Sequence, residues 1–160
     1  MSIKIGDTMP AGSFGIMTDQ GPGTITTDEL FGGKKVVLFS VPGAFTPTCS
    51  AKHLPGFVDL ADRIKAKGID SIACLAVNDA FVMGAWGKQA GADGKVLMLA
   101  DGNCTYTKAL GLEFDASGFG MGTRGQRFAL VVDHGVVKNL FVEAPREFKV
   151  SAAEHVLANL

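Results

Sequence analysis

The sequence predicts an α/β fold in which helices flank a central, mixed β-sheet. Short apolar segments alternate along the chain with longer segments whose apolar residues recur at helical spacing. Near the C-terminal end, two apolar segments are separated only by the turn sequence Asp133-His134-Gly135, which indicates a hairpin. At 160 residues, of which 47% are hydrophobic, the chain is long enough for one well-buried domain and too short for two. We therefore expect a single domain over residues 1–160.

The first half of the chain predicts two strands and one long helix. Residues 36–40 form an uninterrupted apolar run of the kind found in buried strands. A helix is expected over about residues 48–67, because apolar residues recur there every three or four positions, and Gly68 is a natural stop for it. Residues 71–77 predict the second strand.

The same alternation continues in the middle of the chain. Asn78 or Asp79 can cap a helix that runs to about Ala90. Residues 96–100 predict the third strand, and residues 105–110 a short helix.

A glycine-rich loop at residues 115–125 separates these elements from the C-terminal hairpin, whose strands are expected at residues 128–132 and 136–142. Ser151 and Glu154 have the spacing of a capping box, which predicts a last helix. A β-α-β-α-β half followed by a hairpin and a terminal helix is the arrangement of the thioredoxin fold.

Charge and hydropathy exclude several classes of partner. Charged residues make up 19% of the chain, the formal net charge is −1, and lysine and arginine form no run, so neither nucleic acid nor an anionic membrane surface is an expected partner. No stretch approaches the roughly 18 consecutive apolar residues of a membrane-spanning helix, and residues 1–7 resemble neither a signal peptide nor a presequence. We expect a cytoplasmic protein that acts on a small or neutral partner.

Cys49 is the residue with the strongest indication of chemistry. It follows a predicted strand and opens a predicted helix, where unpaired backbone N–H groups and the helix dipole favour a thiolate. A free cysteine is often only a small core residue, but the polar neighbours Thr46 and Ser50 argue against that interpretation. The chain has three cysteines at irregular spacing, which is typical of neither a disulfide framework nor a zinc site, and no metal or cofactor is expected.

Two familiar cysteine chemistries do not fit the segment around Cys49. A dithiol oxidoreductase would need a second cysteine three positions earlier, where the chain has Thr46. A phosphatase-type loop would need glycines and an arginine soon after the cysteine, and residues 50–55 supply neither. A lone thiolate can instead attack the O–O bond of a peroxide and become a sulfenic acid.

Thiolate formation at Cys49 does not by itself make a fast peroxidase. Full ionisation of an ordinary thiol at pH 7 raises the fraction present as thiolate about 30-fold. The lower pKa that this requires reduces the reactivity of each thiolate by about 10-fold. Most of the rate must come from donors placed where charge develops on the peroxide oxygens. Thr46, three residues before Cys49, is one candidate donor, and an arginine is the natural second. His53 is either a residue at the pocket mouth or a partly exposed residue of the helix.

These residues resemble the active-site motif of the peroxiredoxins. Pro42, Thr46 and Cys49 have the spacing P-x-x-x-T-x-x-C, and the strings PGAFTPTCSAKHLPGF, KAKGI and VNDAFVMGAW resemble the type 5 subfamily, called type II in plants. The resemblance implies a thioredoxin-fold peroxidase that reduces hydrogen peroxide and alkyl hydroperoxides. It also implies that Cys49 is the peroxidatic cysteine, Thr46 its hydrogen-bonding partner and Pro42 the ring that shields the pocket from water.

The resemblance extends to an arginine and to a second cysteine. The arginine of the family stands immediately before an aromatic residue at the start of a strand, which here is Arg127 before Phe128, with Arg124 as the alternative. Cys74 alternates with apolar residues and is expected to be a buried structural thiol. Similar plant proteins, however, have a cysteine at this position that is sometimes proposed to resolve the sulfenic acid. Cys104 departs from the family pattern, and no role is expected for it.

The resemblance places the reset step outside the chain. Animal type 5 enzymes carry a resolving cysteine just before the last helix, and residues 148–152 contain none. We therefore expect an external thiol as reductant, either glutathione with glutaredoxin or thioredoxin. The resemblance also implies a homodimer. The candidates for its interface or for covering the pocket, which could instead be core or loop-packing residues, are Phe45, Phe81, Met83, Phe119 and Met121. The alternative from another class is a non-catalytic redox switch that uses Cys49 only as an oxidisable sensor.

Overall fold

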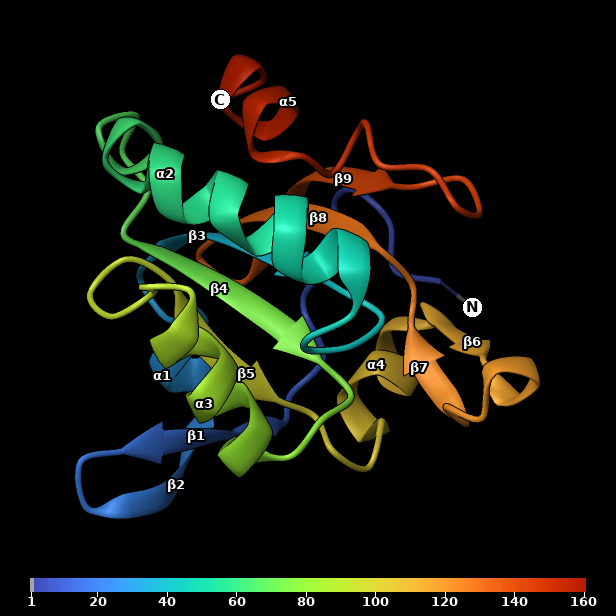
Figure 1. Ribbon diagram of the computed structural model, residues 1–160. Helices are drawn as coiled ribbons and strands as arrows, with labels where there is room; N and C mark the ends of the chain where they lie inside the picture. Colours follow the sequence, from blue (N-terminus) through green and yellow to red (C-terminus); the bar gives the residue numbers. More distant parts are fainter. Residues whose placement is uncertain (1) are drawn as a thin grey trace.

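One mixed sheet forms the centre of the protein (Figure 1). The computed structural model describes residues 2–160. The strands of the sheet are β1 (Ser13–Thr18), β2 (Gly21–Thr26), β3 (Lys35–Ser40), β4 (Ser71–Ala76), β5 (Leu97–Ala100), β8 (Phe128–Asp133) and β9 (Val136–Val142). Their order is β2-β1-β5-β4-β3-β8-β9, with β3, β4 and β5 parallel and the other neighbouring pairs antiparallel. The predicted mixed sheet is confirmed.

Helices cover both faces of this sheet. They are α1 (Thr27–Phe31), α2 (Leu54–Lys65), α3 (Ala80–Gln89), α4 (Thr105–Leu110) and α5 (Ala153–Ala158). Side chains of α2, α3 and α5 pack on one face, and those of α1 and α4 pack on the other. Figure 1 shows α2 and α3 in front of the sheet and α5 beside β9. This is the thioredoxin-like arrangement that the sequence predicts. Within residues 2–160, no helix has the length and apolar character needed to cross a membrane.

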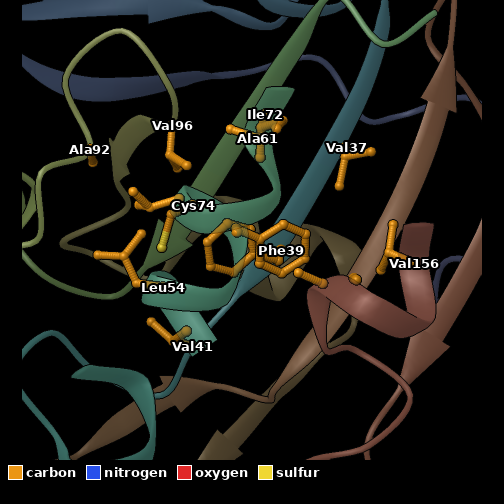
Figure 2. Packing of buried hydrophobic residues seen from close by; sticks show 14 of the residues in the cluster. Val37, Phe39, Val41, Leu54, Ala61, Ile72, Cys74, Ala92, Val96 and Val156 are labelled. Carbon is orange, nitrogen blue, oxygen red and sulfur yellow. The ribbon is translucent and has the colours of Figure 1, made fainter. Parts of the chain in front are cut away.

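The central strands are buried on both faces, which explains their uninterrupted apolar sequence. Along β3, Val37 and Phe39 belong to the cluster under α2, whereas Val36 and Leu38 belong to the cluster on the opposite face. Figure 2 shows part of the first cluster. In it, the Phe39 ring stacks on Phe57 of α2 with the ring centroids 4.0 Å apart. This stack holds the start of the helical segment against the sheet.

The sequence patterns did not predict the elements before residue 35. β1 and β2 form an antiparallel hairpin, although β2 reads GPGTIT and its glycines and proline give little strand signal. The five-residue α1 is held by a capping box in which the Glu29 N–H donates to the Thr26 hydroxyl and the Thr26 N–H donates to the Glu29 carboxylate. These elements depend on pairing and capping more than on hydrophobic periodicity.

The glycine-rich segment is more ordered than the sequence suggests. It contains part of a short hairpin formed by β6 (Glu113–Asp115) and β7 (Thr123–Gly125), with a 3₁₀ turn at Ser117–Phe119 between the strands. The hairpin places Arg124 beside the loop that follows β3, as described below.

The capping box predicted for the last helix is wrong. The N-cap of α5 is Ala152, and its side chain cannot accept a hydrogen bond. The Ser151 hydroxyl donates instead to the Glu143 carboxylate at 2.7 Å. Ser151 is therefore engaged by the segment that follows β9 and not by the helix that it precedes.

Candidate active site

Cys49 lies in the first turn of the helical segment that follows β3. The Ser50 N–H donates to the Thr46 carbonyl at 2.9 Å, so the helical hydrogen bonding starts at Thr46. Pro47 comes next, at the first helical position, which favours proline. The N–H groups of this first turn have no intrahelical acceptor and give this end of the helix a positive partial charge. The Cys49 side chain is buried, with 0% of its surface exposed.

The turn that contains Cys49 is π-helical, not α-helical as predicted. The Leu54 N–H donates to the Cys49 carbonyl five positions back, and regular α2 begins only at Leu54. Pro55 gives the physical reason, because it has no N–H and its ring crowds the carbonyl four residues earlier. Such turns widen a helix and are frequent at functional sites.

Arg127 connects the Cys49 thiol to a histidine. It stands immediately before β8, and its Nη2 donates to Cys49 Sγ at 3.1 Å while its Nη1 donates to His53 Nδ1 at 2.8 Å. His53 Nε2 lies 3.0 Å from the Ser151 carbonyl oxygen. Because a guanidinium only donates, Nδ1 is the unprotonated nitrogen, and Nε2 carries the hydrogen that bonds Ser151.

His53 is a neutral, fully buried acceptor. Its exposed fraction is 0%, and its ring contacts those of Phe39 and Phe148 at centroid distances of 4.9 and 5.0 Å. Burial, together with the positive charge of Arg127, lowers the pKa of His53 from 6.5 to about 3. The expectation that His53 lies at the pocket mouth or is partly exposed is wrong. Its spacing of four residues from Cys49 was the only sequence signal that the two share a helix face.

Thr46, three residues before Cys49, is half-buried, and its hydroxyl is already engaged. Its Oγ1 donates to the Gly43 carbonyl at 2.7 Å. A hydroxyl has one hydrogen, so in this geometry the Thr46 oxygen is available to a ligand as an acceptor. The sequence predicts this hydroxyl as a donor to peroxide, whereas in this geometry its hydrogen is directed at the Gly43 carbonyl.

Arg124 contacts the active-site loop and not the thiol. Its Nη1 donates to the Pro42 carbonyl at 3.3 Å and its Nε donates to the Met121 carbonyl at 2.9 Å. A Cβ added to Gly43 would lie 2.9 Å from Arg124 Nη1, so the loop and this arginine are fitted closely together. Of the two candidate arginines, Arg127 contacts the Cys49 thiol, whereas Arg124 binds the carbonyl of the half-buried Pro42.

Comparison with known proteins gives the family of this chain. The sequence profile described as Redoxin matches residues 4–157. Chloroplastic peroxiredoxin-2E-2 of Oryza sativa subsp. japonica is 50% identical over 165 residues, with 99% of this chain and 73% of that protein covered. Peroxiredoxin-2C of the same plant is 48% identical over 159 residues, with 99% and 98% covered. Reduced Prx3 from Vibrio vulnificus in complex with hydrogen peroxide is 56% identical and gives a TM-score of 0.94, with 98% of each chain covered.

The chain is a peroxiredoxin of the type II, or type 5, subfamily. It is thus a thiol-dependent peroxidase, as the active-site motif implied. This membership favours turnover over the alternative of a non-catalytic redox switch. The crystal structure of peroxiredoxin 5 from Alvinella pompejana, at 35% identity and a TM-score of 0.85 over 98% of this chain and 96% of that one, has the same fold.

The two other cysteines of this peroxiredoxin are buried away from solvent. Within residues 2–160 all three cysteines are free thiols. Cys74 lies in β4, paired with Phe39 of β3 and Met98 of β5, and it belongs to the same core cluster as Cys49 (Figure 2 labels Cys74). Burial, then the nearby Cys49, raise the pKa of the Cys74 thiol well above its usual value. Burial and the neighbouring Asp101 carboxylate also raise the pKa of Cys104.

Two polar contacts that sequence patterns did not single out hold the peroxiredoxin loop before and after Cys49. The Ala44 N–H donates to Asn78 Oδ1 at 2.9 Å, and Trp86 Nε1 donates to Ser50 Oγ at 3.1 Å. Asn78 follows β4 and Trp86 lies in α3, so both contacts depend on the tertiary fold. They fix the loop to the neighbouring βα unit.

The pH dependence of stability tests the neutral state of His53. Because the pKa of His53 falls from 6.5 to about 3 on folding, the unfolded chain takes up this proton first as the pH decreases. The contribution of His53 to stability is therefore complete above about pH 6.5 and is lost as the pH falls toward about 3. The slope in this window approaches about 1.4 kcal/mol per pH unit.

Urea unfolding of the wild type and of His53→Gln at about pH 7 and about pH 4.5 measures this effect. The wild type should lose more unfolding free energy between the two pH values than the variant, whose side chain does not titrate. Equal losses in the two proteins would contradict a buried neutral His53.

Proposed function

We propose that Cys49 is the peroxidatic cysteine of this enzyme, that Arg127 and Thr46 bind and activate the peroxide, and that Pro42 shields the pocket from water. The observation that carries the proposal is the contact of Arg127 Nη2 with Cys49 Sγ at 3.1 Å. The guanidinium keeps its charge throughout the physiological pH range. It therefore stabilises the thiolate before reaction and is placed to stabilise the peroxide oxygens as they become negative.

The proposed step is a displacement on oxygen. The Cys49 thiolate gives its electron pair to one peroxide oxygen, so that an S–O bond forms while the O–O bond breaks. The other oxygen leaves with the bonding pair as hydroxide or alkoxide and takes a proton from solvent to give water or an alcohol. Cys49 is oxidised to a sulfenic acid and the peroxide is reduced.

Thr46 orients the substrate in this proposal. Since its hydrogen is committed to the Gly43 carbonyl, the Thr46 oxygen can accept the O–H of a peroxide, while Arg127 donates to the peroxide oxygens from another side. Hydrogen peroxide and alkyl hydroperoxides both offer an O–H and an O–O bond, and both are proposed substrates. Prx3 from Vibrio vulnificus, which is 56% identical, has been solved in complex with hydrogen peroxide, and this supports the assignment.

The proposed reductant is an external thiol, either glutathione with glutaredoxin or thioredoxin. Attack of such a thiol on the sulfenic acid gives a mixed disulfide and water, and a second thiol then releases Cys49 as a thiol. Cys74 is a poor resolving group because its strand is paired on both sides and its thiol has 0% exposure. A reducing compartment such as the cytoplasm would supply the thiols that this cycle consumes.

Mass spectrometry after treatment with peroxide and glutathione tests both the nucleophile and its reset. The wild type should carry a glutathione adduct on Cys49 and should turn over peroxide with glutaredoxin or with thioredoxin. Cys49→Ser should consume no peroxide, whereas Cys74→Ser and Cys104→Ser should react as the wild type does. A disulfide between Cys49 and Cys74 in place of the adduct would contradict the external reset.

We also propose that the chain forms a homodimer through a surface that includes Phe45, next to Thr46 in the active-site loop, together with Phe81 and Phe119. Phe45, Phe81 and Phe119 expose 50%, 65% and 75% of their surfaces, and the Phe45 ring lies 6.3 Å from that of Trp86, whose indole N–H bonds Ser50. Exposed large aromatic side chains favour an interface over free solvent.

Sedimentation equilibrium measures this association. The wild type should sediment as a dimer, and Phe81→Ser or Phe119→Ser should shift it toward the monomer. Ile5→Ser is the control, because Ile5 is 61% exposed and lies outside the proposed surface. A monomeric wild type, or an equal effect of Ile5→Ser, would contradict the proposed interface.

A further inference from the structure

A buried carboxylate closes the segment that joins β9 to α5. Glu143 follows β9 directly and is only 8% exposed. Its Oε2 accepts hydrogen bonds from the Lys149 N–H at 2.7 Å, the Ser151 N–H at 2.9 Å and the Ser151 hydroxyl at 2.7 Å. One carboxylate oxygen thus ties the two ends of residues 143–151, which we call the strap.

The strap lies against the buried side of the site. The Phe148 ring contacts the His53 ring at a centroid distance of 5.0 Å and lies 5.8 Å from the Arg127 guanidinium carbon. The Ser151 carbonyl accepts from His53 Nε2 at 3.0 Å. At the other end of the strap, the Glu143 N–H donates to the Arg127 carbonyl at 3.0 Å. The strap therefore contacts Arg127 through the backbone at one end and through His53 at the other.

These contacts form a closed ring of hydrogen bonds, from which one further donor, Arg127 Nη2, is directed at the thiol. Glu143 holds Ser151, the Ser151 carbonyl keeps the hydrogen of His53 on Nε2, and the free Nδ1 accepts from Arg127 Nη1. With Nη1 fixed, the planar guanidinium directs Nη2 at Cys49 Sγ. Without the Ser151 carbonyl in place, the Nε2 hydrogen of His53 loses its acceptor, and the ring that presents Nδ1 to Arg127 loses the contact that holds its orientation.

We propose that Glu143 is a positioning residue for Arg127, acting through Ser151 and His53. The proposal rests on the assignment of Cys49 and Arg127 under the proposed function. Glu143 touches neither the thiol nor the peroxide. It sets the orientation of the donor that does, and it makes the strap a part of the peroxidatic site.

The charge state of Glu143 supports this role. Burial works to raise its pKa, but the hydrogen bonds from the Ser151 side chain and from the backbone N–H groups of Ser151, Lys149 and Val150 outweigh burial and lower the pKa. The side chain is therefore a carboxylate at neutral pH. Hydrogen bonds to a carboxylate are stronger than those to a neutral oxygen, which suits a group that closes a segment with exposed residues at 144–147.

A double-mutant cycle between Glu143 and Arg127 tests the proposal. The rate constant for Cys49 oxidation by hydrogen peroxide is measured by stopped flow for the wild type, Glu143→Ala, Arg127→Gln and the double variant. The Glu143→Ala substitution should lower this rate constant by about tenfold or more in the wild-type background. It should lower the rate constant little further in the Arg127→Gln background, because the guanidinium that Glu143 positions is already gone. An unrelated structural loss would slow both backgrounds equally.

Two further variants serve as a control and as a conservative replacement in the double-mutant cycle. Glu147→Ala makes the same change in the same strap, but the Glu147 side chain pairs with Lys149 at the surface at 3.6 Å, so this variant should react as the wild type does. Glu143→Gln keeps an oxygen that accepts from Ser151 and should recover part of the rate. If Glu143→Ala does not fold, as judged by circular dichroism, Glu143→Gln carries the cycle in its place.

Alkylation of Cys49 by iodoacetamide supplies a second readout, since it requires the thiolate but not an oriented peroxide. The rate of alkylation at a fixed, neutral pH should fall in Glu143→Ala as Sγ loses the Arg127 donor. The inference is overturned if Glu143→Ala oxidises within about twofold of the wild type, or if its effect is the same in Arg127→Gln. Peroxide consumption by the Cys49→Ser variant would instead contradict the proposed function itself.

Discussion

The contact between Arg127 and Cys49 is the interaction on which the rest of this site depends. A thiolate with no exposed surface has lost its hydration, and a buried charge is tolerated only when a partner charge and hydrogen bonds replace water. Arg127 supplies both through Nη2. Burial and the same guanidinium keep His53 neutral, and only a neutral imidazole can accept from Arg127. The neutral state of His53 is thus consistent with its contact with Arg127.

Strand pairing brings these groups together from positions 78 residues apart in the sequence. β3 and β8 are antiparallel neighbours, and Ser40 at the end of β3 pairs with Phe128 at the start of β8. The Ser40 hydroxyl also donates to the Gln126 carbonyl at 2.9 Å. The loop that leads to Cys49 and the residue before β8 are therefore held at the same edge of the sheet. The central sheet is the scaffold that sets the distance between thiol and guanidinium.

Sequence patterns predicted the strands and helices with strong periodicity, and the spacing of Thr46 and Cys49, because these are local properties of the chain. They missed β1 and β2; β2 contains two glycines and a proline, which weaken the strand signal, and the strand conformation of both comes from their pairing. They also missed the π-helical turn, although Pro55 was visible as its cause. The role of Glu143 could not be predicted, since every partner of its carboxylate lies on a segment without regular periodicity.

We propose that the fixed, two-pronged geometry of Arg127, and not its charge alone, activates the peroxide at Cys49. Arg127→Lys keeps the charge but cannot donate to Cys49 Sγ and His53 Nδ1 from one rigid group. The most direct measurement is the rate constant for oxidation of Cys49 by hydrogen peroxide in Arg127→Lys, with Arg124→Lys as the matched control. We expect a loss of about 100-fold for Arg127→Lys and a near-normal rate for Arg124→Lys. A rate for Arg127→Lys within about threefold of the wild type, or equal losses in the two variants, would contradict it.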